Sequence, residues 1–341
     1  MTSKSQTMQE KDCNLYILVL RALSVLSIVS SHTFDVQVNA SHISHVLAQF
    51  LCNVGSIGVS VFFVLSGYVF PFSVEKSKGF FSFFRRKINT LFIPWFFCAT
   101  IYYCYIAFRK GGSISGWIIC SLGYASAFWF MSVLIMLFAM FFYLYRYQFF
   151  LLLAGFLSVV SFVLIATKTI PHNSFTILLN PFNWMIFFAF GVFLNKKGFS
   201  SLLSVISGLK YYLFIFAFFV LAFMACFGYR HYYSEPLFLP IEILCVFATM
   251  SAGSIICEHP GWIKTVLVEL GKRSFSIYLL HRFFFAGDIV WLLNKTDWWI
   301  TIPLRPFIVC GSVYFSISAG LWLSRKMHIE HLYSLLIGRR A

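Results

Sequence analysis

The chain has 341 residues, of which 60% are hydrophobic, 44 are phenylalanine and only 11% are charged. This composition excludes a soluble globular domain, in which roughly a quarter of the residues are charged. The net charge of +15 does not indicate nucleic-acid binding, because no basic cluster alternates with exposed aromatic residues in a soluble module. We therefore expect an all-α, polytopic membrane protein in contact with the lipid bilayer.

Apolar segments long enough to cross a bilayer occur ten times. They cover about 15–34, 46–72, 90–108, 128–145, 149–166, 179–195, 209–228, 237–257, 274–293 and 301–324. The polar leader 1–12 is not followed by a cleavage site, so we expect no cleaved signal peptide. We interpret 1–341 as a single transmembrane domain with no fused soluble domain.

Lysine and arginine residues are distributed unequally between the two sides of the predicted membrane. Of the 26, 18 lie on one side, five lie on the other, and Arg21, Arg282 and Arg305 lie within the apolar segments. Because cytoplasmic loops carry the excess of positive charge, both termini are predicted to be cytoplasmic.

The first apolar segment carries two ionisable residues, Arg21 and His32. Eleven steps of 100° return to within about 20° of the start, so both residues project from one helical face, roughly 16 Å apart. Ser24, Ser31 and Asp35 fall within the same arc. Ionisable groups at membrane depth usually line a cavity or a partner helix, so this polar stripe indicates a functional site. Arg21 considered alone could equally well extend its side chain to the membrane interface and have no functional role.

The second segment and the loop after it carry two further patterns. Small residues at 55, 56, 58, 60, 66 and 67 allow a neighbouring helix backbone to approach closely. The loop 72–89, which precedes Pro94, contains five basic residues: Lys76, Lys78, Arg85, Arg86 and Lys87. Such a cluster is either a topology anchor or a site for a phosphorylated cytosolic ligand.

Other polar residues carry weaker signals. The nine cysteines are odd in number and lie mostly in apolar runs, so we expect no disulfide framework. His42 and His45 lack a nearby carboxylate or thiolate, which favours exposed loop residues over a metal site. Glu242 and Asp288 lie well inside predicted spans, where they are candidate partners for Arg282, Arg305 or His281.

Five motifs, in order along the chain, resemble the integral-membrane acyltransferase-3 family of bacterial O-acyltransferases. They are the arginine and histidine separated by ten residues at 21 and 32, GVSVFFVLSGY at 58–68, the basic loop before Pro94, FWFM at 128–131 and LGKRSFSIYLLH at 270–281. The family tends to place two arginines three residues apart in the basic loop. Here those positions are Lys87 and Thr90, and Arg85 and Arg86 are candidates for the missing charge.

The resemblance implies transfer of an acyl group, most often acetyl, to a cell-envelope carbohydrate such as lipopolysaccharide O-antigen or exopolysaccharide. The donor would be a cytosolic acyl-coenzyme A, most often acetyl-CoA, acting as a substrate rather than a bound cofactor. The acceptor would be an envelope glycan or a lipid-linked saccharide, and the location the bacterial cytoplasmic (inner) membrane. Neither a metal nor a nucleic acid is implied.

Acyl transfer requires a base, groups that stabilise the oxyanion and residues that bind the donor. His32 is the candidate general base, and Asp35 could orient its imidazole, although another span could supply that group. Arg21 would contact the donor or polarise its thioester. A last group of residues is assigned to donor binding: Arg85, Arg86, Lys87, Trp129 and His281.

Two other functions are compatible with a polar stripe in a membrane protein. A transporter or flippase of a lipid-linked saccharide or acyl intermediate would use it as a translocation path. We find no inverted repeat and no matched pair of broken helices, which argues mildly against this function. A purely structural partner in polysaccharide synthesis would leave Arg21 and His32 unexplained.

Overall fold

The computed structural model describes residues 2–124, 128–197, 199–232, 235–283, 285–295 and 298–338. All elements in this part of the chain are helical. The α-helices are α1 (Thr2–Ser30), α2 (His42–Glu75), α3 (Phe80–Lys87), α4 (Ile93–Lys110), α5 (Ile114–Ser121), α6 (Trp129–Leu144), α7 (Gln148–Ala166), α8 (Met185–Lys197), α9 (Phe199–Cys226), α10 (Phe238–Glu258), α11 (Trp262–Lys272), α12 (Ser274–Leu280), α13 (Phe285–Asn294), α14 (Thr301–Lys326) and α15 (Glu330–Leu336). Two π-helical turns, η1 (Ile88–Phe92) and η2 (Phe175–Leu179), and the 3₁₀ turn η3 (Pro181–Asn183) complete the list.

The predicted all-α membrane architecture is confirmed. Seven helical runs among the described residues are long and apolar enough to span a membrane, or eight if α12 and α13, bent by 69°, form one broken span. The remaining two predicted segments correspond to the shorter apolar helices α6 and α8. The 16 residues of α6 rise only about 24 Å, less than the hydrocarbon core of about 30 Å. In the segment 179–195, α8 is short because η3 begins at Pro181 and occupies the first residues.

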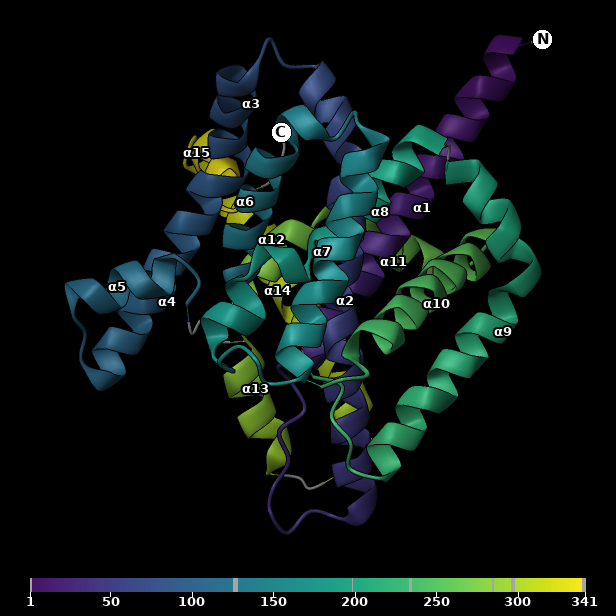
Figure 1. Ribbon diagram of the computed structural model, residues 1–341. Coiled ribbons are helices and arrows are strands. Elements are labelled where there is room, and N and C mark those ends of the chain that lie inside the picture. Colours follow the sequence, from purple (N-terminus) through teal and green to yellow (C-terminus); the bar gives the residue numbers. More distant parts are fainter. Residues whose placement is uncertain are drawn as a thin grey trace.

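The first helix, α1, runs through the middle of the bundle and packs against α2, α10, α11 and α14 (Figure 1). Close helix approach depends on the small residues of α2, as predicted. A Cβ atom added at Gly58 would lie 2.2 Å from the carbonyl oxygen of Ser24 on α1. One added at Gly67 would lie 2.1 Å from the carbonyl oxygen of Phe188 on α8. Neither position accommodates a larger residue without moving a helix backbone.

Aromatic side chains fill the core beside α2 and also cover outward-facing helix surfaces. Phe70 lies within 5.3–5.6 Å, between ring centroids, of Phe83, Phe138 and Phe188. On α9, by contrast, large apolar side chains such as Phe219 are exposed. An exposed apolar face on a long helix is what contact with lipid requires.

Both ends of the described chain lie toward the same end of the molecule. Figure 1 shows the start of α1 near α3 and α15 in height, whereas the loop 31–41 and the end of α13 lie toward the opposite end. The basic residues of α3 are therefore separated along the bundle from the turn that carries His32. Which of these two ends faces the cytoplasm stays a prediction from the charge distribution.

Candidate active site

Two histidines from distant parts of the sequence meet beyond the end of α1. His32 lies in the turn after Ser30, and His281 follows the last residue of α12. Their ring centroids are 5.2 Å apart, with an angle of 31° between the ring planes. His32 is half-buried, whereas His281 is only 1% exposed. The pair therefore has one member within reach of an external molecule and one enclosed by the helices.

Arg282 determines the tautomer of His32. Its Nη1 lies 3.2 Å from Nδ1 of His32. A guanidinium group has only hydrogen-bond donors, so Nδ1 must be the acceptor. In the neutral imidazole, the hydrogen atom is then on Nε2, which leaves Nε2 able to donate.

The tautomer of His281 is determined in the opposite sense. Its Nδ1 lies 2.7 Å from the carbonyl oxygen of Tyr278, which can only accept, so Nδ1 carries the hydrogen atom. The lone pair is therefore on Nε2, which is buried and has no hydrogen-bond partner among the described residues. Leaving a buried polar atom unpaired costs about 1–3 kcal/mol.

Arg305 holds the segment that follows α1. This α14 residue is 2% exposed, and its guanidinium donates to the backbone carbonyl groups of Thr33 and Asp35. It also donates to Oδ1 of Asn294 on α13, at 2.8 Å. Hydrogen bonds of Arg305 thus connect the turn carrying His32 to α13 and α14. Asp35 joins the site through its backbone, and the contact that orients the imidazole of His32 comes from Arg282.

A cavity of about 540 Å³ opens where α1, α2, α6 and the α11–α12 junction come together. Its basic residues are Arg21, Lys87, Lys272 and Arg273. Glu269 also lines it and forms an ion pair with Lys272, with Nζ and Oε1 2.6 Å apart. The predicted donor residues Arg21 and Lys87 therefore line the same cavity. Lys272 and Arg273, which were not predicted to bind the donor, line it as well. The signal for these two was their place in the LGKRS stretch of the C-terminal motif.

The three adjacent basic residues predicted to bind donor phosphates, 85–87, lie in different environments in the structure. Lys87 is half-buried, lines the cavity and lies over the ring of Phe138, 4.9 Å from its centroid. Arg85 and Arg86 are exposed and are not among the residues that line this cavity. Arg86 instead donates to backbone and hydroxyl oxygen atoms of the preceding loop, at Ser73 and Ser77.

Helix α12 connects the cavity with the histidine pair. Tyr278 lines the cavity, and its carbonyl group holds the ring of His281 one turn further along the chain. Phe130, which also lines the cavity, packs edge-on against Tyr278, with ring centroids 5.6 Å apart. Trp129, predicted to bind the donor, is not among the residues that line the cavity and packs against Trp184, with ring centroids 5.0 Å apart. Tyr278 thus contacts both the cavity and His281, whose ring lies beside that of His32.

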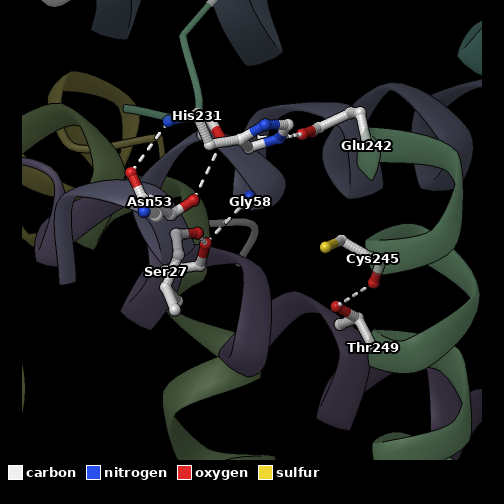
Figure 2. Close-up of polar contacts among 9 residues, drawn as sticks. Ser27, Asn53, Gly58, His231, Glu242, Cys245 and Thr249 are labelled. Carbon is white, nitrogen blue, oxygen red and sulfur yellow. Dashed lines mark hydrogen bonds and ion pairs between the residues drawn. The ribbon is translucent and has the colours of Figure 1, made fainter. Parts of the chain in front are cut away.

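A second buried polar cluster joins α2, α10 and the loop between α9 and α10 (Figure 2). Nε2 of His231 lies 2.6 Å from Oε2 of Glu242, and these side chains are 1% and 0% exposed. Asn53 accepts from the backbone N–H of His231 at 2.8 Å and donates to the carbonyl of Tyr229 at 3.1 Å. The partner of Glu242 is thus His231, which was outside the predicted set, while Asp288 is exposed.

The described residues include all nine cysteines and no cluster of metal-ligating side chains. All nine cysteines are free thiols. Within the described ranges, no group of three His, Cys, Asp or Glu side chains is arranged to hold a metal ion. The ionisable groups at the cavity and the histidine pair are imidazole, guanidinium and ammonium groups and the carboxylate of Glu269.

A family model for an acyltransferase domain, acyltransferase-3, matches residues 14–321. The chain belongs to the acyltransferase-3 family. The match runs from within α1 to most of α14, so the histidine pair and all residues that line the cavity except Gly338 lie within the family domain of this acyltransferase. Comparison with curated proteins found no match, and comparison with solved structures found none either.

Proposed function

We propose that this acyltransferase moves an acyl group, most simply acetyl, from a cytosolic acyl-coenzyme A to a hydroxyl of a cell-envelope carbohydrate. The acceptor would be lipopolysaccharide O-antigen, an exopolysaccharide or a lipid-linked saccharide at the bacterial cytoplasmic membrane. One observation carries this proposal: helix α12 lines a cavity with basic residues and ends next to His281, which pairs with His32.

The size and charge of the cavity support the proposal that it binds a coenzyme A thioester. Its volume of about 540 Å³ is within the usual range for small-molecule sites. Four cationic side chains, of Arg21, Lys87, Lys272 and Arg273, offer charge-assisted hydrogen bonds to phosphate groups. Thr90, at a position where the family tends to have arginine, also lines the cavity. Lys272 and Arg273 would supply the charge that Thr90 lacks.

The acceptor would approach from the opposite end, where His32 is half-buried near the loop 31–41. Acyl transfer removes the proton of the acceptor hydroxyl as its oxygen attacks the thioester carbonyl. The carbon–sulfur bond then breaks, and the leaving thiolate takes up the proton. Imidazole groups serve this exchange because their ordinary pKa of about 6.5 allows both steps at neutral pH. The buried histidine pair would supply them.

Comparison of the envelope polysaccharide from strains with and without the gene would test the proposal. Proton NMR should show O-acetyl signals only when the gene is present, with the amount of polysaccharide unchanged. Purified protein in liposomes should transfer label from [¹⁴C]acetyl-CoA to the unacylated polysaccharide of the gene-deleted strain. Loss of the polysaccharide itself, without any labelled transfer, would instead indicate a transporter or flippase.

A further inference from the structure

The hydrogen bonds of the histidine pair separate a proton donor from a proton acceptor. Arg282 occupies the Nδ1 lone pair of His32, so Nε2 of His32 carries hydrogen and can only donate. The carbonyl group of Tyr278 holds Nδ1–H of His281, so Nε2 of His281 retains its lone pair. In this arrangement the lone pair available to a hydroxyl group belongs to His281, although the sequence predicted His32 as the base.

The free lone pair of His281 lies in an enclosed position. The residue is 1% exposed, and Nε2 has no hydrogen-bond partner within the described part of the chain. Buried polar atoms are nearly always paired in folded proteins, and an exception calls for an explanation such as a catalytic role. Here the unpaired atom lies on the helix that lines the cavity, with its ring 5.2 Å from that of His32.

We propose that His281 is the general base of the acyl transfer and that Nε2–H of His32 stabilises the oxyanion. This assignment rests on the proposed function. The O–H bond of the acceptor breaks, its proton moves to Nε2 of His281, and the oxygen bonds to the thioester carbonyl carbon. The carbonyl oxygen gains negative charge and accepts a hydrogen bond from His32. The carbon–sulfur bond then breaks, and the thiolate takes the proton from His281.

Arg282 is a positioning residue in this scheme. Its guanidinium cannot accept a hydrogen bond, so it keeps Nε2 of His32 in the donating form throughout the reaction. An oxyanion donor aligned before the reaction avoids reorganisation as charge develops. Two residues of one segment, Tyr278 and Arg282, thus determine the proton positions of both rings.

Two substitutions distinguish this assignment from one in which His32 is the base. In His281→Asn, the amide can take the place of Nδ1–H and bond the carbonyl group of Tyr278, but it offers no nitrogen base in the place of Nε2. In His32→Gln, the amide can take the place of Nε2–H and donate, but it cannot accept a proton at neutral pH. Each variant therefore keeps one property of the ring and removes the other.

The assay is transfer from [¹⁴C]acetyl-CoA to unacylated envelope polysaccharide, using purified full-length protein in liposomes. His281→Asn should lower kcat at least about a hundredfold, the usual contribution of a general base, with little change in donor KM. His32→Gln should remain within about tenfold of the parent, whereas His32→Ala should lose about 100-fold to 1,000-fold, as for a missing oxyanion donor.

His259→Asn is the matched control. Nδ1 of His259 contacts the backbone carbonyl of Ile255 at 2.8 Å, much as His281 contacts Tyr278, but His259 is exposed at the end of α10. Its kcat should equal that of the parent. Size-exclusion profiles and helical circular dichroism establish folding. If His281→Asn does not insert correctly, His281→Gln, which also cannot take up a proton at neutral pH, should show the same loss.

The reverse pattern would overturn the assignment. A His32→Gln variant as inactive as His32→Ala, beside an active His281→Asn variant, would make His32 the base. Equal large losses in His32→Gln and His281→Asn, or none in either, would also contradict the division of roles. A parent protein that transfers no label from acetyl-CoA would instead contradict the proposed function.

Discussion

Removal of one partner of the buried pair His231–Glu242 should destabilise the protein severely, and removal of both should not. In His231→Leu, the carboxyl group of Glu242 remains 0% exposed without the partner that lies 2.6 Å away. Leaving a buried polar group without its hydrogen-bond partner costs about 1–3 kcal/mol, and more when the group is charged. We expect the same range for Glu242→Leu, which leaves the imidazole of His231 unpaired.

The double variant, with leucine at 231 and 242, should lie within about 1 kcal/mol of the parent, because apolar replacement of a whole buried pair is often neutral. The backbone N–H of residue 231 would keep its bond to Asn53, since that contact does not involve the replaced side chain. The coupling between the two sites in a double-mutant cycle should therefore be large.

The free energy of unfolding can be measured by titrating each variant with SDS in mixed micelles and following helical circular dichroism. Glu330→Gln is the control, because the ion pair of Glu330 with Arg325 is exposed and should contribute no more than about 1 kcal/mol. Single variants within about 1 kcal/mol of the parent, or a double variant that loses the sum of both single losses, would refute the reasoning.

Three further predictions concern packing, donor binding and topology. A Cβ at Gly67 would lie 2.1 Å from the carbonyl oxygen of Phe188, so Gly67→Ala should lower the free energy of unfolding by about 1–3 kcal/mol in the SDS titration. Gly287→Ala is the control, because no atom lies within 4 Å of the added Cβ; equal losses in the two variants would contradict the helix contact. Lys87→Gln should raise the KM for acetyl-CoA roughly tenfold, because one charge-assisted contact is worth about 1–3 kcal/mol, and Arg85→Gln should leave this KM unchanged. Equal KM values in the two variants would assign Lys87 to membrane topology alone. An alkaline-phosphatase fusion at the C-terminus should be inactive, and an active fusion would reverse the predicted orientation.

The sequence alone predicted the membrane class, the ten apolar helical segments and the family. These properties depend on local patterns: the length of apolar runs, the helical period and short motifs. The same local geometry placed small residues such as Gly58 and Gly67 at helix contacts. It placed Arg21 correctly on the first helix, but α1 ends at Ser30, so His32 lies in the turn beyond it and not on the predicted shared helical face. For these features, the information lies within a few helical turns of each residue.

Only the tertiary structure decided which polar side chains meet. His32 and Arg282 are 250 positions apart, and their contact depends on how α12 packs beside the end of α1. The partner of Glu242 proved to be His231, from a loop, because the fold of α9 and α10 returns that loop over α2. Lys87 reaches the cavity while Arg85 does not, since neighbouring residues on a helix point in different directions. Hydrophobic length and period are encoded along the chain, whereas the pairing of buried polar groups is chosen by the packing of helices far apart in sequence.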